Sequence, residues 1–299
     1  QKVAEMAWAS WTFWWTSGNL EEGRRWMEEA LAAGPDLPAS ARAKLLFVAA
    51  TLGQALGDFD SSQLLIEESR ALFEQLGDKR GLGMAVGTAG LVALGQDRRG
   101  RGLALMEESI RLYLEVGEKW GAAAMLGFSA TVPLARGDLT RARQLAERGL
   151  SLAREVGARD ITYVTLYPLA TIALLEGDNR RARRLFEEGL RLSSEVGEKV
   201  NVAFCLEGLA AVAASEDELE SAARLWGAAE AILEEVQVIT YPYASDRSLY
   251  HRRVAAARAR LEQRTWAQAW AEGREMGFER AMAYALKSEV SVAWDDREA

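Results

Sequence analysis

The chain repeats itself every 40 residues, and this spacing constrains the fold more than any single residue does. Positions that must be small keep the same step, because neighbouring helices approach closely there. Self-similarity at such a period is typical of a solenoid, in which stacked helical hairpins bury a core only against their neighbours. The sequence therefore predicts an array of hairpins. One column of small residues is Ala50, Gly90, Ala130, Ala170 and Ala210.

Each repeat combines two kinds of helix. Residues 219–236 place apolar or small side chains at a 3.6-residue rhythm, which indicates an amphipathic helix with one buried face. Residues 200–214 are apolar nearly all round, as expected for a helix that neighbours cover on several sides. Between helices, Gly137 stands where a helix ends in the left-handed conformation, and Asp138 is suited to cap the next helix. Each repeat is therefore predicted to be a helical hairpin.

The small columns follow tetratricopeptide spacing, with both helices lengthened beyond the standard repeat of about 34 residues. We predict an all-α fold, a right-handed superhelical solenoid of about six 40-residue tetratricopeptide-like hairpins over residues 1–237. A C-terminal extension of three helices over residues 246–290 lacks the repeat and is expected to pack on the last hairpin. The hairpins are expected at 3–33, 40–76, 79–116, 119–156, 159–196 and 199–236, and the tail helices at about 246–262, 264–275 and 278–290.

Composition argues against several classes of function. The net charge of −8 and the isoelectric point near 5.1 argue against direct nucleic-acid binding. No apolar run reaches the roughly 18 residues that a membrane span needs. A single cysteine is typical of a reducing cytoplasm, and with one cysteine and one histidine the chain has no paired histidines or paired cysteines to hold a metal. The sequence also lacks a phosphate-binding loop. We therefore expect a cytoplasmic protein that is not an enzyme and binds no metal, cofactor, nucleic acid or membrane.

Three kinds of reactive residue leave alternatives open. Cys205 lies in an apolar helix, where it is either a buried small hydrophobic residue or a redox or modification site. His251 is expected at the surface without a catalytic role. The abundant glutamates could form a catalytic carboxylate pair, but arginines stand four residues away, as Arg143 does from Glu147. This spacing favours ordinary ion pairs within a solvated helix face.

A concave groove is the first candidate binding surface, because the inner helices of tetratricopeptide arrays line one. The candidate lining is apolar with scattered hydroxyls, and it lacks a cluster of Lys, Arg or Asn that would hold a peptide carboxylate. A small or amphipathic ligand suits it better than a highly charged one. Each residue could instead serve packing alone. The candidates are Trp8, Trp15, Phe47, Thr51, Gln54, Met84, Leu91, Thr131, Val164, Tyr167, Thr171, Phe204 and Glu207.

Two further surfaces are candidates. A basic ridge on the outer helices could dock an acidic domain or a nucleic-acid backbone, although its interleaved glutamates favour a plain solvated face. Its members are Arg101, Arg141, Arg143, Arg181 and Arg183. An N-terminal tryptophan cluster could be core and terminal cap, or an interface with an upstream domain or a ligand. Its members are Trp8, Trp11, Trp14, Trp15 and Trp26.

Three stretches together carry a family resemblance: WTFWWTSGNLEEGRRW at 11–26, SAARLWGAAEA at 221–231, and AWAEGREM at 269–276 followed by residues 281–286. They resemble the C-terminal tetratricopeptide region of bacterial LuxR- and MalT-like or AfsR-like multidomain signal-transduction ATPase regulators. The resemblance implies an upstream NTPase module, a DNA-binding helix-turn-helix elsewhere in the polypeptide, and repeats that sense an inducer or partner and control self-association. The chain begins without Met, so we expect a fragment of a larger protein whose neighbouring NTPase domain is missing.

The resulting hypothesis is a non-catalytic sensor and protein-interaction domain of a cytoplasmic bacterial STAND-type transcriptional regulator. Its expected partner is a protein or a small-molecule effector, and the resemblance also allows a homo-oligomer. The alternative is a freestanding tetratricopeptide scaffold that gathers partner proteins. The residues alone identify neither the ligand nor which of the three surfaces binds it.

Overall fold

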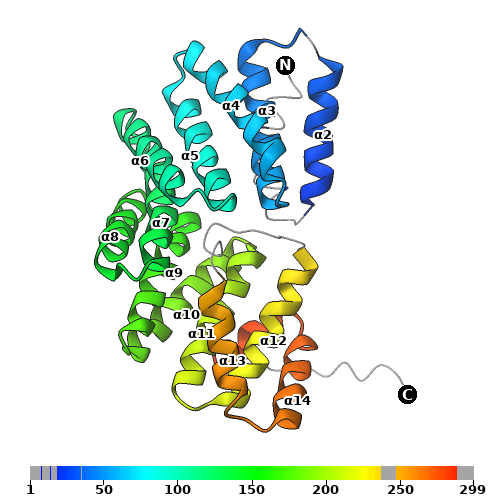
Figure 1. Ribbon diagram of the computed structural model, residues 1–299, viewed down its shortest axis with the longest axis vertical. Helices are drawn as coiled ribbons and strands as arrows, with labels where there is room; N and C mark the ends of the chain where they lie inside the picture. Colours follow the sequence, from blue (N-terminus) through cyan, green and yellow to red (C-terminus); the bar gives the residue numbers. More distant parts are fainter. Residues whose placement is uncertain (1–7, 9–13, 15–18, 35, 237–246, 288–299) are drawn as a thin grey trace.

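The fold is given by a computed structural model, in which every regular element of the described residues is a helix (Figure 1). Consecutive helices pack pairwise, and the pairs stack along a curved path from α2 to α12. This arrangement confirms the predicted all-α solenoid of tetratricopeptide-like hairpins. The structure describes residues 8, 14, 19–34, 36–236 and 247–287.

The helices of the array keep the 40-residue step from α3 onward. The expected first helix, within residues 3–18, lies outside the described residues except for Trp8 and Trp14, which are both helical. The array helices are α2 (Leu20–Ala33), α3 (Ala39–Ala55), α4 (Phe59–Gln75), α5 (Lys79–Gly95), α6 (Arg99–Glu115), α7 (Lys119–Ala135), α8 (Leu139–Glu155), α9 (Arg159–Leu175), α10 (Asn179–Glu195), α11 (Lys199–Ser215) and α12 (Leu219–Val236).

The turns between helices show why the period is so regular. Gly137 has φ +80°, a left-handed backbone that closes helix α7, and the Asp138 carboxylate accepts a 3.0 Å hydrogen bond from the Arg141 N–H at the start of α8. Asp97 and Asp217 occupy the same turn position with φ of 57° and 67°. The turn conformation is therefore conserved along the array even where glycine is absent.

Burial separates inner from outer helices as predicted. In α11 nearly every residue is buried, whereas α10 buries a single stripe that includes Phe186 and Leu190. The small columns lie where helices meet: Ala130, Ala170 and Ala210 are fully buried. The core is therefore built both between the two helices of each hairpin and between each hairpin and the next.

The three tail helices end the array differently from a further repeat. The second has the predicted length and is shifted by one residue from 264–275, whereas the first and third end earlier than the predicted 246–262 and 278–290. Helix α14 packs along α12, while α13 contacts α11 and α12 beside the inner surface. None of the described helices is both long and apolar enough to cross a bilayer. The tail helices are α13 (Ser248–Arg258), α14 (Gln263–Arg274) and α15 (Phe278–Ala285).

Tight backbone contact and stacked tryptophans fix the tail on the array. A Cβ atom on Gly227 would lie 2.2 Å from the Trp270 carbonyl oxygen, and one on Gly273 would lie 2.0 Å from the Arg224 carbonyl oxygen. The Trp266 ring lies 6.0 Å from that of Trp226 and 5.7 Å from that of Trp270. The second and third stretches of the family resemblance are thus the two sides of one helix contact.

Candidate ligand-binding site

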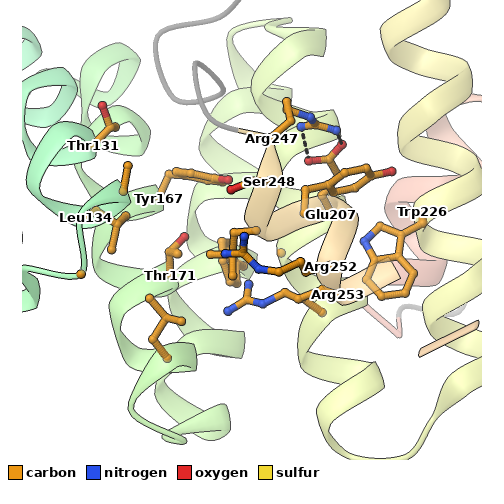
Figure 2. A pocket seen from close by; sticks show the side chains of 18 residues that line it. Thr131, Leu134, Tyr167, Thr171, Glu207, Trp226, Arg247, Ser248, Arg252 and Arg253 are labelled. Carbon is orange, nitrogen blue, oxygen red and sulfur yellow. Dashed lines mark hydrogen bonds and ion pairs between the residues drawn. The ribbon is translucent and has the colours of Figure 1, made fainter. Parts of the chain in front are cut away.

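A cavity of about 250 Å³ lies between the inner helices of repeats four to six and the tail helix α13 (Figure 2). Helices α7, α9 and α11 supply one side, and residues 247–253 supply the other. Its floor is largely apolar, with Leu134, Leu175 and Phe186 among the lining side chains. The cavity exists only because the tail folds back over the inner surface.

Four of the predicted groove residues meet in this cavity: Thr131, Tyr167, Thr171 and Glu207. They come from three successive inner helices, so the repeat places them side by side. The Tyr167 ring packs edge-on against those of Phe186 at 5.9 Å and Phe204 at 6.1 Å. Burial raises the pKa of the Tyr167 phenol, which keeps it protonated and able to donate a hydrogen bond.

Glu207 does not face the cavity as a free carboxylate. Its two oxygens accept hydrogen bonds of 2.6 and 2.7 Å from the Arg247 guanidinium, and only 5% of its side chain is exposed. Arg247 also stacks over the Tyr250 ring, 3.9 Å from its centroid. Burial raises the pKa of Glu207, and the arginine opposes that effect. This bidentate pair joins the tail to the last inner helix.

The tail also brings two arginines that the sequence analysis did not place here. Arg252 and Arg253 line the cavity, and Figure 2 shows both side chains extending from α13 toward the side where Thr171 lies. The expectation that the lining lacks an arginine cluster was wrong, because it considered only the repeats. The His251-Arg252-Arg253 stretch is a visible basic signal, but the tail has no repeat register to show which way it points.

The other groove candidates lie away from the cavity. Phe47 is 3% exposed and packs against the Trp8 ring at 5.5 Å, which is a packing role. Thr51 donates a hydrogen bond to the Phe47 carbonyl within its own helix. Trp15 lies outside the described residues. Eight groove candidates are buried or partly buried and do not line the cavity: Trp8, Phe47, Thr51, Gln54, Met84, Leu91, Val164 and Phe204.

Four arginines of the basic ridge have carboxylate partners on neighbouring hairpins. Arg101 pairs with Glu67 at 3.1 Å and Arg141 with Glu107 at 3.0 Å, each partner 34 residues earlier. The expected pairing of Arg143 with Glu147 is replaced by one with Glu176. Pairs that bridge repeats neutralise the ridge, which favours a solvated face over a docking site. The remaining members are Arg183, paired with Glu216, and Arg181, whose backbone N–H donates to Asp178.

The reactive residues take ordinary places. Cys205 is buried, and burial raises the pKa of its thiol to about 12, so it behaves as a small hydrophobic residue. His251 is exposed and stacks against Tyr250. Within the described part of the chain, no three His, Cys, Asp or Glu side chains are grouped to hold a metal ion.

The chain matches no protein-family model, and no curated protein is similar to it in sequence. Solved structures are similar in fold. One is the Rap protein complexed with Competence and Sporulation Factor, with a TM-score of 0.61 and 12% identity over 89% of this chain and 76% of that one. Another is BtubC (BKLC) from P. vanneervenii, with a TM-score of 0.51 and 17% identity over 87% and 93% of the two chains. At such identities the likeness concerns the fold.

Proposed function

We propose that this chain is a non-catalytic sensor and interaction module that binds an effector or a short segment of a partner protein. The observation that carries the proposal is the cavity in which side chains of three repeats and the tail converge. Concave, mostly apolar sites with a few polar groups are typical of ligand binding. The Rap protein, which shares the fold, was solved as a complex with Competence and Sporulation Factor, and this supports a ligand-binding role.

The proposed setting is a cytoplasmic bacterial STAND-type transcriptional regulator, in which an NTPase module precedes this chain. Support comes from the family resemblance of residues 221–231 and 269–276, whose helices pack together through Gly227 and Gly273. The sequence of the intact gene tests this setting. We expect an encoded NTPase module with a DNA-binding, kinase or cyclase domain. A gene that encodes only the repeats would support the alternative, a freestanding scaffold.

The proposed mechanism is linkage between cavity and tail. Helix α13 forms one side of the cavity and also contacts α11 and α12. A ligand that contacts both α9 and α13 therefore favours the docked position of the tail. It shifts the equilibrium by the difference between its affinities for the docked and undocked states. The neighbouring module would respond to that shift.

Blocking the cavity tests the binding role. Ala135 is exposed at the cavity edge, so Ala135→Trp is expected to obstruct it without disturbing the core. Ser215→Trp is the matched control, because Ser215 is the exposed residue two repeats later at the same position and does not line the cavity. We would purify each variant from the host and measure bound mass by native mass spectrometry. Ligand should stay on the wild type and on the control, and be absent from Ala135→Trp. Retention by Ala135→Trp would contradict the proposal.

A further inference from the structure

The cavity holds an excess of hydrogen-bond donors. Arg252 and Arg253 have no ion pair among the described residues, although the chain carries 44 acidic side chains. The Thr171 hydroxyl, on a residue only 6% exposed, also has no hydrogen-bond partner in the described part of the chain. On the outer helices, four arginines pair with glutamates of an adjacent repeat: Arg101, Arg141, Arg143 and Arg183. Other described arginines, such as the exposed Arg180, also lack an ion pair, but Arg252 and Arg253 differ from Arg180 in lining a cavity.

One further donor near the cavity, the indole N–H of Trp226, is buried without a partner in the described part of the chain. Trp226 is 1% exposed, lines the cavity, and has no acceptor for its Nε1–H among the described residues. Figure 2 places the indole nitrogen on the side of the ring that faces α13. An unsatisfied buried donor costs free energy, and native proteins keep few of them. The Trp226 Nε1–H is itself closed off from solvent, so it is a cost of the packing beside the cavity and is not counted among the groups that a ligand would contact.

The charge of the two arginines has no compensation within the cavity. Arg253 is half-buried, and burial lowers the pKa of its guanidinium, with the adjacent Arg252 charge adding to that effect. Glu207 is the carboxylate in the lining, and Arg247 already occupies both of its oxygens. Arg252 is exposed, so water solvates its charge, whereas the partly buried charge of Arg253 favours a counter-charge nearby. An anion bound between α13 and α9 would supply it.

We propose that Arg252 and Arg253, with the Thr171 hydroxyl, form a subsite for a ligand carboxylate inside the cavity. The proposal rests on the proposed function and specifies the chemical class of the ligand. A carboxylate fits better than a phosphate, because the remaining lining is mostly apolar and a dianion would need more donors. A cavity of about 250 Å³ is below the usual size for drug-like ligands, so it suits one terminal residue of a peptide or a small organic acid.

Paired probes test the subsite and distinguish the two sources of carboxylate. Isothermal titration calorimetry would compare N-acetyl-alanyl-leucine with its C-terminal amide, together with butyrate and inorganic phosphate. We expect saturable binding of a probe with a free carboxylate. Binding of the dipeptide acid would identify a peptide end as the source, and binding of butyrate would identify a small organic acid. The amide and phosphate should bind at least about tenfold more weakly. Equal binding of acid and amide, tighter binding of phosphate, or no binding by any probe would overturn the proposal.

Variants of the same helix assign the effect to the two arginines. The double variant Arg252→Gln/Arg253→Gln should weaken carboxylate binding by about tenfold or more. Arg258→Gln is the matched control, because Arg258 lies on α13, is exposed and does not line the cavity. It should retain affinity within about twofold, and circular dichroism should show equal helicity for both. If Ala135→Trp abolishes binding while the double variant does not, the proposed function stands and the carboxylate subsite is refuted.

Discussion

At the scale of single residues, the turn between the helices of a hairpin sets the geometry of the array. Its first position has a left-handed backbone in every described hairpin from repeat two to repeat six, and glycine is the residue that adopts it at little cost. Asp97 and Asp217 hold the same conformation with a Cβ atom, at φ of 57° and 67°. These two turns store a small strain that the glycine turns do not.

Replacing Asp97 with glycine should therefore stabilise the protein. The substitution relieves the left-handed strain, but it also removes an exposed ion pair with Arg99 and gives the unfolded chain more freedom. Because the relief of strain is the larger effect, the free energy of unfolding should rise by about 0.5–1 kcal/mol. Thermal unfolding followed by circular dichroism should show a midpoint higher by roughly 1–2 °C. The reciprocal change Gly137→Ala, at φ +80°, should lower it. A lower midpoint for Asp97→Gly would refute this explanation of the turn.

At the scale of elements, a close approach of two helices decides where the tail lies. Helices α12 and α14 cross at Gly227 and Gly273, where backbone carbonyls occupy the space that a side chain would need. Trp226, Trp266 and Trp270 then pack around the crossing. Small residues at such a crossing allow contact that larger side chains would prevent, so glycine here serves packing rather than turn formation.

Gly273→Ala should displace the tail. Its Cβ would lie 2.0 Å from the Arg224 carbonyl oxygen, and overpacking of this kind costs about 1–3 kcal/mol, more than alanine gains in helix propensity. Limited trypsin digestion should cleave within residues 247–287 faster than in the wild type. Gly100→Ala is the control, since Gly100 is exposed with open space around its Cβ position. Equal cleavage rates for Gly273→Ala and the wild type would mean that the crossing does not hold the tail.

At the scale of the whole molecule, one ion pair connects the tail to the array beside the cavity. Glu207 belongs to the repeat and Arg247 to the start of α13, and their bidentate contact is largely removed from water. Such a pair contributes little net stability compared with an apolar substitute, but removing one partner leaves a costly unpaired charge. The pair therefore determines position more than it determines total stability.

Glu207→Ala should release α13 and enlarge the cavity opening. Loss of the two charge-assisted hydrogen bonds should weaken tail docking by about 2–3 kcal/mol. Hydrogen–deuterium exchange should then speed up in α13 but not in α3 to α6. The double variant Glu207→Met/Arg247→Leu removes both charges and should restore much of the protection. If α13 exchanges at the wild-type rate in Glu207→Ala, the ion pair does not position the tail.

The sequence by itself determined the array, because its contacts link residues within one repeat or between adjacent repeats. Glycine at the turns, acids at the helix starts and small residues at fixed intervals each act over short separations, so their period predicted hairpins and helix boundaries closely. The same reasoning placed Thr131, Tyr167, Thr171 and Glu207 on neighbouring inner helices. It could not predict that Arg247 would occupy the Glu207 carboxylate.

Only the tertiary structure decided how the tail completes the site. Residues 247–287 lack the period, so no register shows which face of α13 turns inward. That choice depends on the Gly227–Gly273 crossing and on the Glu207–Arg247 pair, which join segments about 40 residues apart. Once they fix α13, Arg252 and Arg253 line the cavity and change it from an apolar groove into a site rich in donors. The packing of the tail on the array, which the 40-residue period does not describe, therefore decided which polar side chains line the cavity.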